Sequence, residues 1–235
     1  MNNTAIDFLT YSYLGVTHDQ CDWEMLLANS IDRACKDATN QGAYNTRVKE
    51  YMRKKSAEQK AESKNELQDI FRELFSDKKM VYDEWHKKAC SRLLEGFKGL
   101  PFEYGNAQKW VNMTSKYLYI AYSLDLLKGH EKDVLEKYMR DFHVPIDSYI
   151  LEGLKYTDID CQIESSTWSR WKDSGKYYEL QDVLRKRFTR NEGTVLVWEN
   201  KLWTAVAQYR KTTDKASIKE TIKDLVQSSE SVEVI

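Results

Sequence analysis

The sequence contains few of the two residues that most often interrupt helices: only two prolines and nine glycines occur in 235 residues. Proline and glycine are the least favourable residues inside a helix, and folds rich in strands need many turns, where these two residues are common. The most strand-like run, TVLVW (194–198), is short and fits a buried helix equally well. We therefore predict an all-α, multi-helix protein.

Long apolar runs, closely paired cysteines and a secretory signal are also missing. The cysteines are scattered and form no CxxC pair: Cys21, Cys35, Cys90 and Cys161. No run of apolar residues approaches the length of a membrane span, and the first residues, MNNTAIDFLTYS, lack the basic start and apolar stretch of a signal peptide. These absences predict a cytoplasmic protein with reduced thiols and no membrane partner.

The sequence also offers little for a metal or a bound cofactor. His86 and Cys90 are four residues apart and would share a helix face, but His18, His130 and His143 supply no second pair of ligands. Neither a phosphate-binding P-loop nor a dinucleotide-binding fingerprint is present. We predict that no metal and no cofactor is required.

An excess of charge of either sign is absent too, since the formal net charge is −1. This excludes a protein that binds nucleic acid through a globally basic surface, but a local basic groove would still be compatible with it. The segment 47–64 concentrates basic residues, which indicate either a solvated helix or a surface that faces phosphates. Seven tryptophans and fifteen tyrosines are core residues or stacking platforms for bases.

Apolar residues recur at spacings of three and four along most of the chain, which is the helical period. One helical domain is expected over 1–235, arranged as two lobes with a cleft between them. Asp77 is a candidate cap for the third helix. The expected helices are 22–39, 44–75 (with a break near Ser63 as an alternative), 77–97, 104–122, 132–142, 147–154, 167–191, 195–211 and 217–227.

The predicted helix YGNAQKWVNMTSKYLYIAY (104–122) has an unusual distribution of polar residues. Its apolar stripe would face the core, while Lys109, Asn112 and Lys116 share another face that Met113 and Ile120 make partly apolar. A lysine beside apolar surface can lose solvation and become a nucleophile. The alternative is that both lysines are ordinary solvated charges.

The segment HVPIDSYIL (143–151) follows this helix at a distance. Pro145 would end the preceding helix, and Asp147 stands where the next helix should begin, which is a usual position for a capping aspartate. Capping alone would explain Asp147. The order of a turn, a lysine and then an aspartate 38 residues later supports a second interpretation.

GLPFEYGNAQKW followed by HVPIDSYIL resembles the helix-hairpin-helix DNA glycosylase superfamily, and the likeness is greatest to the archaeal 8-oxoguanine glycosylase branch. It covers roughly residues 79–155. The resemblance implies that Lys109 is the nucleophilic amine and Asp147 the catalytic carboxylate. It also implies that the hairpin at 99–106 contacts phosphates through backbone N–H groups and the helix that follows.

The same resemblance implies a DNA-binding surface and a pocket for the extruded base. The expected DNA contacts are Gly105, Asn106, Gln108, Asn112 and Lys116. The base pocket would be lined by Trp110, Trp168 and Trp171, for which core packing is the alternative.

The predicted function is excision of a modified base from DNA to leave an abasic site, with strand cleavage left open. An oxidised purine follows from the resemblance, and a hypermodified base in phage DNA is the other candidate; the role would be DNA repair or phage defence. A helical interaction module is one alternative. A helical nuclease of a toxin or defence system is another, although Arg140 and His143 are too close for its Arg-x(4–6)-His motif.

Overall fold

The computed structural model consists of helices and describes residues 3–39, 44–76, 78–156, 159, 167–172, 174–189, 193–213 and 215–227. Within these residues the chain forms ten α-helices, three short 3-10 helices and no strand. The all-α prediction is therefore confirmed. No helix in the described part of the chain combines the length and apolar character needed to cross a bilayer. Asp77, the candidate cap, lies outside the described residues.

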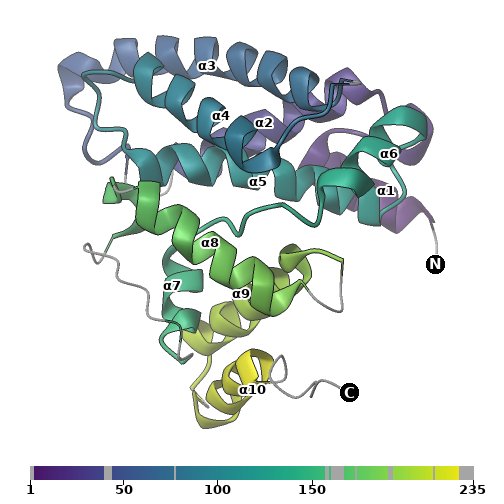
Figure 1. Ribbon diagram of the computed structural model, residues 1–235, viewed down its shortest axis with the longest axis vertical. Coiled ribbons are helices and arrows are strands. Elements are labelled where there is room, and N and C mark those ends of the chain that lie inside the picture. Colours follow the sequence, from purple (N-terminus) through teal and green to yellow (C-terminus); the bar gives the residue numbers. More distant parts are fainter. Residues whose placement is uncertain are drawn as a thin grey trace.

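The first six α-helices pack together, and we call them the N-terminal helix group (Figure 1). α5 packs against α2, α4 and α6, and α3 covers α2 and α4. The bounds are α1 (Asn3–Leu14), α2 (Trp23–Thr39), α3 (Arg53–Leu74), α4 (Tyr82–Gly96), α5 (Tyr104–Ser123) and α6 (Gly129–Tyr138), with the 3-10 helices η1 (His18–Gln20) and η2 (Glu50–Met52).

The remaining helices form the C-terminal helix group, in which α9 packs against α7, α8 and α10 (Figure 1). A further 3-10 helix, η3, packs against α5 of the other group. The bounds are α7 (Ser148–Leu154), η3 (Trp168–Arg170), α8 (Ser174–Phe188), α9 (Val195–Lys211) and α10 (Lys215–Gln227).

α5 is the central element, because every residue from Tyr104 to Leu118 is buried. Its apolar stripe packs as expected, and Trp110 is fully buried with its indole N–H donated to the carbonyl oxygen of Ile31 on α2, at 3.0 Å. The polar face with Lys109 and Lys116 is buried as well. The interpretation of both lysines as solvated surface charges is therefore wrong.

The start of α5 is covered by η3, and Gly105 makes this possible. A Cβ atom at this position would lie 1.8 Å from the carbonyl oxygen of Trp168, so only glycine allows the two segments to approach. The Gly105 N–H donates to the carbonyl oxygen of Trp171 at 2.9 Å. Arg47 ties the same junction by donating to Asn106 Oδ1 and to the Ser169 carbonyl oxygen, each at 3.2 Å.

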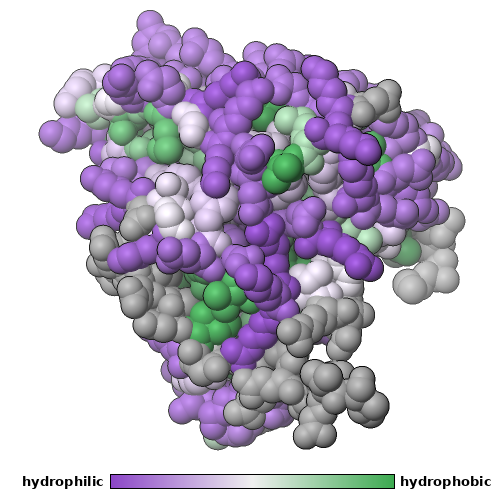
Figure 2. All heavy atoms as spheres, in the orientation of Figure 1, coloured by the Kyte–Doolittle hydropathy of each residue, from purple (hydrophilic) through white to green (hydrophobic). Residues whose placement is uncertain are grey.

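Most of the surface seen in Figure 2 is hydrophilic, and apolar residues appear there in small separate groups. The buried apolar residues form one core cluster, which includes Trp85, Trp110 and Phe71. Trp85 and Phe71 pack edge to face, with ring centroids 4.9 Å apart. The core fixes α2, α3, α4 and α5 relative to one another, and so fixes the position of the α5 lysines.

Candidate active site

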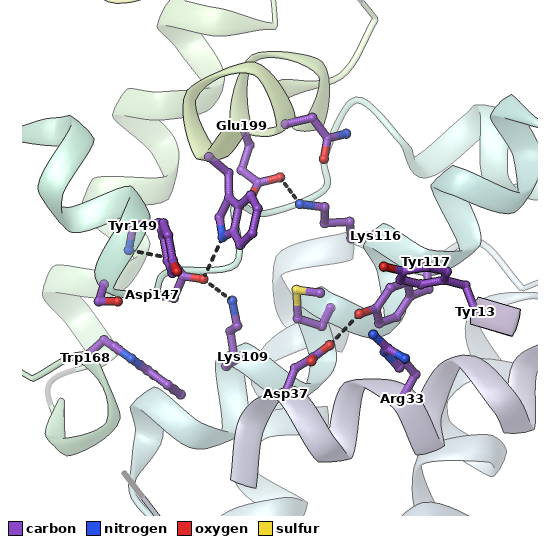
Figure 3. A pocket seen from close by; sticks show the side chains of 14 residues that line it. Tyr13, Arg33, Asp37, Lys109, Lys116, Tyr117, Asp147, Tyr149, Trp168 and Glu199 are labelled. Carbon is purple, nitrogen blue, oxygen red and sulfur yellow. Dashed lines mark hydrogen bonds and ion pairs between the residues drawn. The ribbon is translucent and has the colours of Figure 1, made fainter. Parts of the chain in front are cut away.

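A cavity of about 450 Å³ opens where the two helix groups meet. The N-terminal helix group contributes residues of α1, α2 and α5, and the C-terminal group contributes the start of α7 and part of α9, with η3 at one side (Figure 3). This volume is within the range of small-ligand pockets. The cavity is therefore large enough for a chemical group to enter between the two groups of helices.

Lys109 and Asp147 meet in this cavity, as the sequence predicts. Lys109 Nζ lies 2.6 Å from Asp147 Oδ2, and the two side chains are only 7% and 11% exposed. Lys109 comes from the second turn of α5 and Asp147 from the residue before α7, so the pair bridges the two helix groups (Figure 3).

Asp147 has several hydrogen-bond donors besides Lys109. Its Oδ1 accepts the backbone N–H groups of Tyr149 at 2.9 Å and Ile150 at 3.0 Å, which makes it the N-cap of α7. The Trp203 indole N–H donates to Oδ2 at 3.3 Å. Burial alone would raise the pKa of Asp147, but the Lys109 ammonium and the two backbone donors outweigh it, so the pKa lies below its usual value. Asp147 is therefore a carboxylate at neutral pH.

Two glutamine side chains hold the extended segment that leads to Asp147. Gln108 Nε2 donates to the Ile146 carbonyl oxygen at 2.9 Å, and Gln108 Oε1 accepts the Ile146 N–H at 3.2 Å. Gln181 of α8 makes the same two-way contact with the backbone of Val144, at 2.8 Å in each direction. These contacts replace the helical hydrogen bonds that the segment around Pro145 lacks, and they position Asp147 opposite Lys109.

A second buried ion pair lines the same cavity. Lys116 Nζ lies 2.6 Å from Glu199 Oε2 on α9, and Glu199 is almost fully buried (Figure 3). Burial raises the pKa of Glu199 by more than the Lys116 ammonium lowers it. Lys116 is predicted from the sequence as a DNA contact, whereas Glu199 is not predicted as a site residue. The sequence feature that could have identified Glu199 is its position as the one acidic residue in the otherwise largely apolar run VLVWENKLW.

Flat aromatic side chains form one wall beside Asp147. Tyr149 and Trp203 stack with centroids 4.6 Å apart, and the Arg210 guanidinium lies 3.9 Å from the Tyr149 ring centroid. Trp203 is 36% exposed, and Trp168 of η3, a tryptophan predicted to line a base pocket, also lines this cavity. Tyr149 and Trp203 are site residues that sequence analysis misses, because their meeting depends on how α7 packs against α9.

The other end of the cavity holds polar groups from α1, α2 and α5. Tyr117 donates its hydroxyl hydrogen to Asp37 Oδ2 at 2.5 Å, and the Arg33 guanidinium lies 4.7 Å from the Tyr13 ring centroid. Met113 lines the cavity between the two α5 lysines. The site is thus elongated along α5, with charged groups at several points.

Several residues predicted to contact DNA lie inside the protein instead. Gly105, Asn106, Gln108 and Asn112 are all buried. The carboxamides of the last three have hydrogen-bond partners within the chain, such as the Ala38 carbonyl oxygen for Asn106 Nδ2 at 2.9 Å. Several N–H groups of the predicted hairpin donate to acceptors within the chain, such as that of Gly105 to the Trp171 carbonyl oxygen and that of Glu103 to Asn106 Oδ1.

Two of the three tryptophans predicted for the base pocket are core residues. Trp110 is fully buried on the side of α5 that packs against α2. Trp171 is buried against Tyr177, and the centroids of the two rings are 5.9 Å apart in an edge-to-face arrangement. Neither lines the cavity. The basic residues of 47–64 are not part of its lining either; Arg53 and Lys64, for example, pair with Glu50 and Asp32.

His86 and His143, two of the histidines considered as metal ligands, take part in a buried hydrogen-bond network. His86 Nε2 bonds Asn112 Oδ1 at 2.9 Å, and His143 Nε2 bonds Asp83 Oδ1 at 2.9 Å. Arg185 also contacts Asp83, with its two terminal nitrogens each 2.8 Å from one carboxylate oxygen. No cluster of three or more potential metal ligands occurs in the part of the chain that the structure describes.

We found no match to the chain among models of protein families, curated proteins or solved structures, so its function has to be inferred from the geometry of this site.

Proposed function

We propose that the chain is a DNA glycosylase that excises a modified base, with Lys109 and Asp147 as its catalytic pair. The observation that supports this most directly is the 2.6 Å contact between a lysine amine and a carboxylate on the wall of a cavity between two helix groups. The two residues are 38 positions apart in the sequence, and the fold orients both side chains into one space (Figure 3).

Asp147 is suited to stabilise the positive charge that develops on the sugar. Breaking an N-glycosidic bond gives an oxocarbenium-like transition state, which a fixed negative charge stabilises in a site shielded from water. Its ionised form is maintained by Lys109 and by the N–H groups at the start of α7. Those groups also fix its orientation, so little reorganisation is needed during the reaction.

Lys109 is suited to two successive tasks. As an ammonium it donates a proton to the departing base, which leaves with the electron pair of the C1′–N bond. The resulting neutral amine adds its lone pair to C1′. Transfer of a second amine proton to O4′ then breaks the C1′–O4′ bond and gives a protonated Schiff base. If water adds to C1′ instead, the product is an abasic site without a covalent intermediate.

The walls of the cavity fit an extruded base. Tyr149, Trp203 and Trp168 offer flat aromatic surface beside the catalytic pair, and such surface stacks on bases of any sequence. Exposed cations lie on the same elements, with Lys172 just after η3 and Lys201 on α9. They are candidates for contacts to the phosphates that flank the extruded nucleotide.

The test combines base release with covalent trapping. Wild-type protein is incubated with duplexes that bear a panel of modified bases, and with modified phage DNA, and the released bases are identified by mass spectrometry. Parallel reactions contain borohydride, which reduces a Schiff base to a stable adduct. We expect release of a modified base, loss of the adduct in Lys109→Gln, and loss of release in Asp147→Asn.

The matched control is Lys88→Gln, because Lys88 forms an exposed ion pair with Glu73 away from the cavity. This variant should release base at the wild-type rate. Release without an adduct would assign the attack to water directed by Asp147. Failure of the wild-type protein to release any base from the panel or from modified phage DNA would contradict the proposed function.

A further inference from the structure

The cavity contains two lysine–carboxylate pairs, and only one of them is used in the proposed reaction. Lys109 and Lys116 are seven residues apart on α5, so they share one helix face and are separated by about 10 Å along the helix axis. Their carboxylates, Asp147 and Glu199, both come from the C-terminal helix group (Figure 3). The Lys116–Glu199 pair therefore lies nearer the C-terminal end of α5 than the Lys109–Asp147 pair, and away from the position of the sugar.

The Lys116–Glu199 pair retains hydrogen-bonding capacity for a ligand. Of the described residues, Lys116 is the one hydrogen-bond donor to the Glu199 carboxylate, through Oε2. A carboxylate can accept several hydrogen bonds and an ammonium can donate three. Glu199 Oε1 and the remaining N–H groups of Lys116 are thus one acceptor and two donors on the cavity wall.

Stability alone is a weak explanation for this pair. A buried ion pair often contributes no more to stability than apolar residues of the same volume would, because both charges lose their hydration. Glu199 also interacts electrostatically with Lys109 and Asp147, so it belongs to the same charged site. Its position on the cavity wall therefore favours a role in ligand recognition.

We propose that Lys116 and Glu199 determine base specificity by binding a polar substituent on the extruded base, Lys116 as donor and Glu199 as acceptor. This inference rests on the proposed glycosylase function. With C1′ held beside Lys109 and Asp147, a group that reaches Lys116 must extend along α5 toward a lysine whose backbone lies about two helical turns farther on. One ring or two fused rings do not extend that far, so the substrate class is a base with a polar chain attached to its ring.

The far end of the cavity is consistent with such a chain. On the side of the cavity formed by α2, the lining includes Arg33 and Asp37, which together with Tyr117 of α5 offer both donors and acceptors. Met113, between the two lysines, provides apolar surface where the ring itself would lie. A small oxidised purine would leave Glu199 Oε1 and the remaining N–H groups of Lys116 without a ligand partner, which is unfavourable for a buried pair.

The experiment uses Glu199→Gln, which keeps the shape of the side chain and removes its charge. The probes are three duplexes that contain 8-oxoguanine, a pyrimidine with a polyhydroxylated chain at C5, or an abasic site. We expect the wild-type protein to release the substituted pyrimidine in preference to 8-oxoguanine. In Glu199→Gln, kcat/KM for that release should fall about tenfold or more, while affinity for the abasic duplex, which has no base, should stay within about twofold.

Two further variants keep the test decisive. Lys116→Met combined with Glu199→Leu replaces the pair by apolar residues of similar size, and it should fold and show the same selective loss. Glu73→Gln, in an exposed ion pair, is the matched control and should behave as wild type.

The outcomes separate this inference from the proposed function. An equal loss of base release and of abasic-duplex affinity in Glu199→Gln, or a preference of the wild-type protein for 8-oxoguanine, overturns this inference alone. A wild-type protein that releases no base and does not bind the abasic duplex overturns the proposed function as well.

Discussion

Lys109 and Asp147 neutralise each other inside the protein, so a change to either one affects stability as well as chemistry. Lys109→Met leaves the Asp147 carboxylate buried without its cationic partner, and we expect a loss of about 3–5 kcal/mol in the free energy of unfolding. Adding Asp147→Asn removes the charge and keeps a capping residue at the start of α7, so the double variant should recover much of this loss. Urea unfolding of the four proteins measures the coupling.

Lys88→Met is the control for that cycle, because Lys88 pairs with Glu73 at the surface and the change should cost less than about 1 kcal/mol. Additive effects of Lys109→Met and Asp147→Asn would mean that the two side chains do not interact in solution as they do in the structure.

The order of a turn, a lysine and a later aspartate in the sequence predicts that Lys109 and Asp147 meet, and the structure places their side chains 2.6 Å apart. The sequence does not predict that Glu199 or Trp203 belongs to the site. Both lie on α9, and their positions depend on how that helix packs against α7 and across to α5. Trp110 illustrates a different difficulty, because a large aromatic residue fits a core and a pocket equally well until the neighbouring helices are known.

At the scale of the elements, the contact between the start of α5 and η3 depends on Gly105, which has no side chain. In Gly105→Ala the new methyl group would overlap the Trp168 backbone, which has to move. We expect the free energy of unfolding to fall by about 1–3 kcal/mol, as in other overpacked sites. Because Trp168 lines the cavity, the proposed glycosylase function predicts weaker binding of abasic DNA in this variant.

Gly96→Ala is the comparison, since the nearest atom to its new Cβ would be the end of the flexible Gln59 side chain. At the last residue of α4, alanine should change stability by less than about 1 kcal/mol. Urea unfolding measures both variants, and equal stability of Gly105→Ala and the wild-type protein would contradict the close approach of η3 to α5.

Helices with a regular apolar stripe are predicted well. The predictions 195–211 and 22–39 match α9 (Val195–Lys211) and α2 (Trp23–Thr39) almost residue by residue. α3 continues through Ser63, so the alternative of a break there is wrong. The single helix expected over 167–191 is also wrong, because the chain first forms η3 over Gly105 and only then begins α8.

α1 and the polar face of α5 show where local patterns are insufficient. Sequence analysis assigns no helix to the first residues, and α1 indeed leaves Phe8, Leu9 and Tyr11 exposed, so it has no clear amphipathic pattern. The polar residues of α5 are typical of a solvated face by local spacing. They are buried because other elements, above all the 143–147 segment and α9, cover them.

At the scale of the whole molecule, the buried histidines make stability depend on pH. Burial lowers the pKa of His143 to about 4, although its hydrogen bond to Asp83 acts in the opposite direction. Burial and the nearby His143 also hold the pKa of His86 well below its usual value. Between about pH 6.5 and pH 4, the unfolded chain therefore binds more protons than the folded one.

Stability should consequently decrease as the pH falls through this range, by up to about 1.4 kcal/mol per pH unit for each histidine. Urea unfolding at pH 7.5, 6 and 5 measures the slope. His86→Gln should reduce it, whereas His18→Gln should make it steeper, because contact with Asp7 raises the pKa of His18 and this histidine therefore stabilises the fold as the pH falls. A free energy of unfolding that stays constant from pH 6.5 to 4.5 would contradict the network.

The distribution of charge between the two helix groups has a consequence for motion. The lysines of the two buried ion pairs belong to α5, and the carboxylates of both pairs belong to the C-terminal helix group. Separating the two helix groups would leave all four of these charges without their partners at once, so partial opening is energetically unfavourable. Amide hydrogens in the middle of α5 should then exchange with deuterated solvent only when the entire chain unfolds, whereas those at the ends of α1 and α10 should exchange through local fraying.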